Sequence, residues 1–272
     1  MIDVGRGEPI VLIPGIQGRW EWMAPAIRAL SERHRVLSFS LDETPHRHDV
    51  TTVFDGWIDT VDAMLARAGA PRAVIAGVSF GGLIAMRYAA RRPGQTSALV
   101  LISVPSPRHS LDEQSAAYLR HPRLALPLFA ARGCTRLLPE TLAARLTWAS
   151  RARFLAGHAG RVLRSPIYPS RMAHWVRAWM ATDIEADSRQ VSAPTLILTG
   201  EPHLDRVVPV SQSLEVRNYI KNTRHVVLPQ TGHIGLVSRP VEFADVVSTF
   251  VRGELGSERA DGNDVAAMNR AV

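Results

Sequence analysis

The chain has 272 residues, a formal net charge of +7 and a hydrophobic share of 46%. This length suits one domain with an inserted subdomain, and the composition is that of a soluble globular protein. A single cysteine, Cys134, excludes an internal disulfide framework and fits a reducing compartment, so a cytoplasmic protein is expected. Neither an apolar run of about 18 residues nor a signal-peptide pattern is found, so no membrane span is expected.

The positive charge is concentrated in one segment. Residues 106–180 contain twelve arginines and three carboxylates, whereas the rest of the chain is close to neutral. Because the excess is confined to that segment, we expect no nucleic-acid partner. Two interpretations stay open: biased arginine usage in a chain with a single lysine, and a basic face that docks an acidic partner.

Six short runs rich in Val, Leu and Ile predict strands that are buried on both faces of a sheet. In chain order they span residues 9–15, 34–41, 73–77, 97–103, 195–200 and 224–229. Helical patterns lie between them, at 22–33, 53–69, 81–93 and 211–222. This alternation predicts an α/β fold with a doubly wound, mostly parallel sheet, in which reactive groups gather at the carboxyl ends of the strands.

The alternation stops between residues 106 and 188. That stretch predicts several helices broken at prolines, and we expect it to form an all-helical cap over the carboxyl edge of the sheet. The core then comprises residues 1–105 and 189–253, and the polar segment 254–272 is expected to be a flexible tail. The expected helix breakers are Pro122, Pro127, Pro139, Pro166 and Pro169.

The sequence Gly77-Val-Ser79-Phe-Gly81 lies between a predicted strand and a predicted helix. The spacing alone is common, but the strand-turn-helix context is typical of a nucleophile elbow that exposes a serine hydroxyl. A phosphate-binding loop is the competing use of such glycines. The stretch lacks both the G-x-G-x-x-G spacing and a following Gly-Lys-Ser/Thr.

A serine nucleophile needs a base, and the base needs an acid that fixes its tautomer. His233 lies in a glycine-bordered loop after the last predicted strand, and Asp205 follows the preceding one. The order Ser79, Asp205, His233 is that of a hydrolase triad.

With these motifs in place, residues 1 to about 253 resemble the α/β-hydrolase superfamily, in particular capped carboxylesterases similar to pimeloyl-carrier-protein methyl ester esterases. The resemblance implies an oxyanion hole formed by the backbone N–H groups of Ile16 and Phe80, with Pro14 standing where the family usually has histidine. It implies no cofactor and no metal. The acid loop is longer than usual, which leaves Glu201 open as an alternative to Asp205.

The resemblance implies a serine esterase that hydrolyses small to medium acyl esters through an acyl-enzyme. Gln17 and Trp20 follow the first oxyanion residue and are candidate substrate contacts. Phe129, Trp148 and Trp179, in the predicted cap, are expected to face inward and to roof the pocket. An aspartate at position 79 would mark dehalogenases or epoxide hydrolases, and Gly82 differs from the asparagine usual in carbon–carbon bond hydrolases.

Four alternatives stay open. Cap arginines could dock an acidic acyl carrier protein, which makes the enzyme an esterase or thioesterase of carrier-linked acyl groups. A cofactor-free perhydrolase shares the triad, a hydroxynitrile lyase lacks a positive feature, and a ligand-binding protein can use the same fold. The oligomeric state is not predicted. The candidate docking arginines are Arg132, Arg136, Arg145, Arg151 and Arg153.

Overall fold

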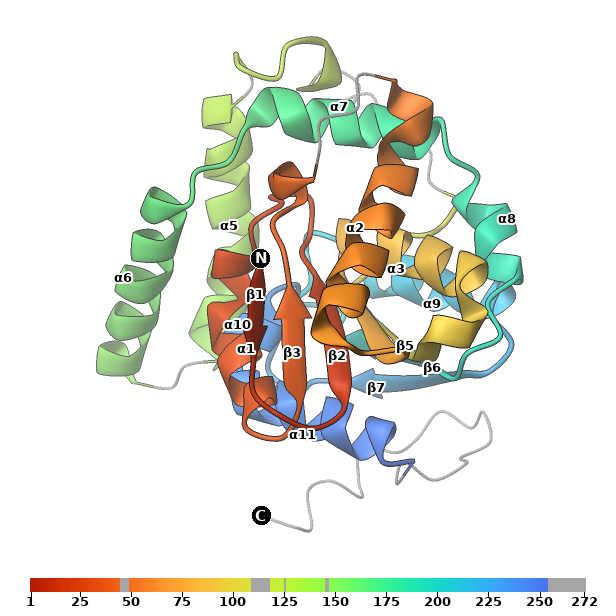
Figure 1. The fold of residues 1–272 in the computed structure, drawn as a ribbon. Helices are drawn as coiled ribbons and strands as arrows, with labels where there is room; N and C mark the ends of the chain where they lie inside the picture. Colours follow the sequence, from red (N-terminus) through yellow and green to blue (C-terminus); the bar gives the residue numbers. More distant parts are fainter. Residues whose placement is uncertain (45–48, 109–117, 125, 145–146, 254–272) are drawn as a thin grey trace.

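A seven-stranded sheet forms the centre of the protein, with helices on both of its faces (Figure 1). The computed structural model describes residues 1–44, 49–108, 118–124, 126–144 and 147–253. The strands are β1 (Ile2–Val4), β2 (Pro9–Ile13), β3 (Arg35–Ser38), β4 (Ala73–Val78), β5 (Thr96–Ile102), β6 (Thr195–Thr199) and β7 (Thr223–Val227). Their order in the sheet is β1-β3-β2-β4-β5-β6-β7, and β1 alone pairs antiparallel to its neighbour.

From β2 onward, the helices in the described part of the chain alternate with the strands, except that several helices lie between β5 and β6. The α-helices are α1 (Ala24–Ser31), α2 (Val53–Ala68), α3 (Phe80–Arg91), α5 (Leu126–Ala144), α6 (Trp148–Arg164), α7 (Pro169–Met180), α8 (Ile184–Arg189), α9 (Val210–Glu215), α10 (Gly235–Ser238) and α11 (Pro240–Val251). Short 3-10 helices are η1 (Trp20–Met23), η2 (Leu41–Glu43), η3 (Val50–Thr52), η4 (Pro93–Gln95) and η5 (Val216–Asn218).

Strands β2 and β4 are apolar along their whole length because both of their faces are covered. Successive strand residues point to opposite faces. In β2, Val11 and Ile13 join the core on the side of α2 and α3, whereas Ile10 and Leu12 join the core on the side of α1 and α11. All four side chains have 0% exposure. This double burial explains why the strands appear in the sequence as unbroken hydrophobic runs.

The expected doubly wound α/β sheet is confirmed, and each of the six predicted strands is present within a few residues of its expected bounds. Strand β1 was not predicted, since three residues are too few to show a pattern. The expected break at Pro139 is wrong. Helix α5 continues through it, at the cost of one backbone hydrogen bond. The other prolines lie outside helices or in their first turn, as Pro169 does in α7.

Residues 106–188, called the insertion from here on, contribute helices α5 to α8 between β5 and β6. Helix α7 crosses one end of the sheet and packs on η3 and α2, while α5 lies beside α10 and α6 against η1 (Figure 1). The indole N–H of Trp22 donates to the carbonyl of Ser165 at 3.1 Å, which fixes the end of α6 to the core. The insertion therefore contacts the core at several separate places.

Within the described ranges, no helix combines the length and the apolar character that crossing a membrane requires. The segment 254–272, expected to be a tail, lies outside the described residues.

Candidate functional site

Ser79 occupies a strained turn between β4 and α3. Its backbone has φ 51° and ψ −120°, a conformation rarely adopted by a residue with a side chain. The turn closes only because glycines flank it. A Cβ atom on Gly77 would lie 2.3 Å from the carbonyl oxygen of Gly81, and one on Gly81 would lie 2.4 Å from that of Pro14. The sequence therefore places a serine where its hydroxyl stands at the start of a helix.

His233 and Asp205 lie together in the loops that follow β7 and β6. The Nδ1 atom of His233 is 3.3 Å from Oδ1 and 3.4 Å from Oδ2 of Asp205. Both residues are buried. Oδ1 of Asp205 also accepts the backbone N–H groups of Val207, at 3.1 Å, and Val208, at 3.0 Å. A carboxylate held in this way can orient an imidazole through its Nδ1–H and leave Nε2 for proton transfer.

The pKa of Asp205 is lowered from its ordinary value, although burial of the carboxyl acts to raise it. The hydrogen bond and charge of His233 and the two backbone N–H groups of Val208 and Val207 outweigh the burial. Asp205 is therefore held as a carboxylate, the form that stabilises a protonated histidine.

The other candidate acid, Glu201, is engaged elsewhere. Its Oε1 accepts the backbone N–H of Gln230 at 2.7 Å, and its Oε2 lies 3.5 Å from Nδ1 of His203. The geometry thus favours Asp205 over Glu201 as the partner of His233.

Ser79, Asp205 and His233 follow three parallel strands and so share one edge of the sheet. In the described residues, no hydrogen bond joins Ser79 Oγ to His233 Nε2. Catalytic hydrogen bonds are often long before substrate binds, so this geometry is compatible with a nucleophile and its base.

The two expected oxyanion residues flank Ser79. Phe80 is the first residue of α3, where a helix leaves its N–H groups without intrahelical partners. Ile16 follows Gly15, and a Cβ atom on Gly15 would lie 3.5 Å from Cβ of Ser79. The turn continues with a hydrogen bond from Gly18 N–H to Gly15 carbonyl at 2.8 Å. Both backbone segments are thus close to the serine.

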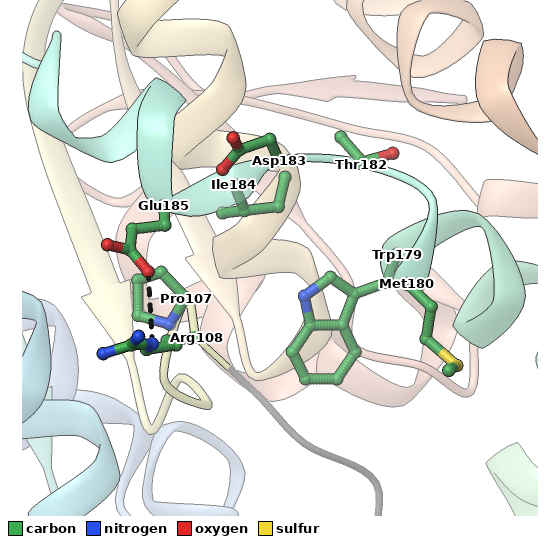
Figure 2. A pocket seen from close by; sticks show the side chains of 8 residues that line it. All are labelled: Pro107, Arg108, Trp179, Met180, Thr182, Asp183, Ile184 and Glu185. Atoms are coloured by element: carbon green, nitrogen blue, oxygen red, sulfur yellow. Dashed lines mark ion pairs between the residues drawn. The ribbon is translucent and has the colours of Figure 1, made fainter.

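Aromatic side chains of α7 pack beside the turn that carries Ser79 and Phe80. The ring of Trp179 in α7 stands edge-on to that of Phe80, with centroids 6.3 Å apart, and Trp175 meets Trp57 in the same way at 6.0 Å. Trp179 also lines a hollow of about 210 Å³ between the end of β5 and α8. Figure 2 shows its indole facing this hollow, across from the ion pair of Arg108 with Glu185. The remaining lining residues are Pro107, Met180, Thr182, Asp183 and Ile184.

The other residues predicted to contact substrate lie in different environments. Trp148 is 79% exposed, so its expected inward orientation is wrong. The face of α6 that packs on the core carries His158 instead, and helical spacing turns Trp148 away from it. The side chain of Phe129 lies outside the described ones. Gln17 and Trp20 are half-buried, Gln17 beside Gly15 and Trp20 against the core near α1.

One buried residue of the site was missed in the sequence. Glu140, in α5, has 0% exposure, and its two carboxylate oxygens each lie 3.0 Å from the backbone nitrogen of Ile234, next to His233. Its Oε1 also accepts the hydroxyl of Ser238 at 3.4 Å. A signal was present: Glu140 is the only carboxylate between residues 114 and 180.

Four of the five expected docking arginines lie in the described part of the chain, and they differ in their contacts. Arg136 and Arg153 are exposed on α5 and α6. Arg132 donates to the hydroxyl of Tyr118, and Arg151 donates to the carbonyl of Leu142 and stacks on Trp148. Arg145 lies outside the described residues.

Comparison with known proteins gives the family context. Residues 10–246 match the model of the alpha/beta hydrolase family. The chain is 26% identical to a 2-hydroxy-6-oxo-2,4-heptadienoate hydrolase of Pseudomonas putida, over 93% of this chain and 92% of the relative. It is 26% identical to a pimeloyl-[acyl-carrier protein] methyl ester esterase of Nitrosomonas europaea, over 88% and 94%. The structure of MenH from S. aureus aligns with a TM-score of 0.72 at 21% identity, over 94% and 98%.

Proposed function

Since the chain belongs to the alpha/beta hydrolase family, we propose that it is a serine carboxylesterase acting on small to medium acyl esters. His233 removes the proton of Ser79 as Oγ attacks the ester carbonyl. The N–H groups of Ile16 and Phe80 stabilise the oxyanion, a contribution of roughly 10²–10³ in rate per donor. His233 then protonates the leaving alcohol, and water, deprotonated by the same histidine, releases the acid and restores Ser79.

The observation that carries this proposal is the contact of His233 Nδ1 with the buried carboxylate of Asp205, at 3.3 Å. It supports an imidazole held in one tautomer with Nε2 toward the edge of the sheet where Ser79 stands. In this proposal the insertion acts as a cap over that edge, with Trp179 as part of the acyl pocket. The single cysteine further supports a cytoplasmic location.

The test is multiple turnover of p-nitrophenyl esters of increasing acyl length by the native enzyme and by Ser79→Ala. We expect the variant to lose about 10³-fold or more in kcat while its circular dichroism spectrum stays unchanged. Activity retained in Ser79→Ala would contradict the assignment of the nucleophile. Saturable binding of esters without turnover by the native protein would favour a ligand-binding role.

The name of the Pseudomonas putida relative suggests a competing substrate to assay. That name concerns 2-hydroxy-6-oxo-2,4-heptadienoate, so the same enzyme preparation should be tested on that dienoate. We expect kcat/KM for the best ester to be higher. A higher value for the dienoate would replace the esterase proposal with carbon–carbon bond hydrolysis.

A second candidate substrate is an acyl ester carried by an acidic carrier protein. The name of the Nitrosomonas europaea relative and the exposed Arg136 and Arg153 in the insertion favour it. The double variant Arg136→Glu, Arg153→Glu should raise KM for a carrier-linked ester about tenfold and leave KM for a p-nitrophenyl ester unchanged. Arg67→Glu, on the exposed side of α2, is the matched control. An equal effect on both substrates would remove the docking proposal.

A further inference from the structure

The insertion reaches the loop of the proposed catalytic histidine through one buried carboxylate. Glu140 belongs to α5, yet its partners belong to the loop and helix that follow β7, 94 and 98 residues further along the chain. Helix α5 lies beside α10, and Ile234 is the residue that caps the start of α10. A side chain from the insertion thus fixes the backbone position next to His233.

Burial of the Glu140 carboxylate costs free energy unless hydrogen bonds compensate for its lost hydration. A carboxylate with 0% exposure loses its hydration, and burial accordingly raises the pKa of Glu140. The backbone N–H groups of Ile234 and Gly232 and the positive charge of His233 act in the opposite direction. Ile234 directly follows His233 in the chain, so the hydrogen bond from its N–H ties Glu140 to the backbone beside the base.

We propose that Glu140 is a positioning residue, which holds the His233 loop in its productive conformation and couples the catalytic base to the insertion. This inference rests on the proposed serine-hydrolase function only for its catalytic consequence. Asp205 and Glu140 have different tasks: Asp205 orients the ring through Nδ1, whereas Glu140 fixes the backbone that carries the ring. Displacement of α5 from the core would release the loop even with Asp205 in place.

The first test measures the loop itself and needs no enzymatic activity. Hydrogen exchange of the Ile234 amide should be slow in the native protein and at least tenfold faster in Glu140→Ala, whereas amides of β4 keep their protection. Thr141→Val is the matched control. Thr141 is the next residue in α5 and is also buried, and its hydroxyl donates to the Leu137 carbonyl of the same helix at 2.9 Å. Equal protection of Ile234 in native protein and Glu140→Ala would overturn the proposal.

The second test concerns catalysis and uses the isosteric Glu140→Gln, which keeps an acceptor but loses the charge. We expect kcat to fall about tenfold or more with KM nearly unchanged, because Glu140 is buried away from solvent and substrate.

Glu140→Asp, which keeps a carboxylate on a shorter side chain, should recover part of the lost kcat. A native kcat in Glu140→Gln would overturn the catalytic part of the proposal. If the native protein proves to have no esterase activity, the exchange experiment still decides whether Glu140 holds the loop. The two proposals can therefore fail separately.

Discussion

Trp179 meets Phe80 edge to face, with ring centroids 6.3 Å apart. One ring comes from the insertion and the other from the residue directly after Ser79. The contact joins an aromatic side chain of the insertion to the ring of Phe80, whose backbone N–H is expected to stabilise the oxyanion. The size of the residue at position 179 should therefore influence which acyl groups fit.

Trp179→Ala is expected to shift the acyl-chain preference toward longer esters. Removing the indole enlarges the hollow that Trp179 lines, and extra methylene groups then gain apolar contact. The ratio of kcat/KM for an octanoate to that for an acetate p-nitrophenyl ester should rise about tenfold. Trp148→Ala, at an exposed tryptophan of the same insertion, should leave the ratio unchanged. An unchanged ratio in Trp179→Ala would place the acyl pocket elsewhere.

Asp205→Asn should reduce kcat by about 10⁴-fold, since the amide no longer stabilises a protonated His233 or its required tautomer. Glu201→Gln, at the competing carboxylate in the same loop, should keep kcat within a few-fold. The Glu201 carboxylate contacts Gln230 and His203 rather than His233. Steady-state kinetics on one ester decide between them. The reverse pattern would make Glu201 the acid.

Gly77→Ala should prevent the elbow from closing. The new methyl group would lie 2.3 Å from the Gly81 carbonyl oxygen and 2.6 Å from the Gly82 Cα, both rigid backbone atoms. We expect a loss of about 3 kcal/mol or more in the free energy of unfolding. Gly94→Ala, where nothing lies within 4 Å of the added atom, should change it by about 0.5 kcal/mol or less. Urea denaturation of both variants gives the comparison, and similar values would argue against a tightly closed elbow.

His225 should make the fold sensitive to acid. Burial in β7 and, to a smaller extent, the charge of Arg217 lower its pKa from 6.5 to about 4. Its Nε2 lies 2.8 Å from the Thr199 hydroxyl. Because the folded-state pKa is depressed, its contribution is present above pH 6.5 and is lost as the pH falls toward 4, by at most about 3 kcal/mol.

The check is urea denaturation at pH 7.5 and at pH 4.5. His225→Gln should lose less stability between these two values than the native protein does. His203→Gln, at an exposed histidine, is the control and should behave like the native protein. A native-like loss in His225→Gln would assign the acid sensitivity to other groups.

The sheet was predictable because each strand carries its own signal. The run 73–77 is apolar at every position, and β4 is buried at every position. Strand β1 has no comparable run and is positioned by pairing with β3, a long-range contact that a local pattern does not contain. Helix α5 shows the opposite case. Pro139 locally disfavours a helix, and so a break was predicted there, but α5 continues through it.

The candidate site was predictable where motif and strand end coincide, as at Ser79, Asp205 and His233. Glu140 was not, because its partner Ile234 is 94 residues away, and being the only carboxylate of residues 114–180 does not by itself mark a residue as buried. The prediction that Trp148 faces inward was wrong for a related reason. An aromatic residue in a helix predicts burial on average, but which face of α6 meets the core is decided by Trp22 and His158, whose ring centroids are 5.8 Å apart.

Arg87 bears on how this protein can be re-engineered. Its buried guanidinium bonds Asp55 of α2 at 2.7 Å and Asp187 of α8 at 2.5 Å, and thereby ties α8 to the core through α3. A chimera in which the insertion helices α5 to α7 are replaced by those of another hydrolase should therefore retain α8 of this protein. Its downstream junction should lie near Asp183. A junction after α8 would exchange Asp187 for a foreign residue and leave a buried cation without one of its two counterions.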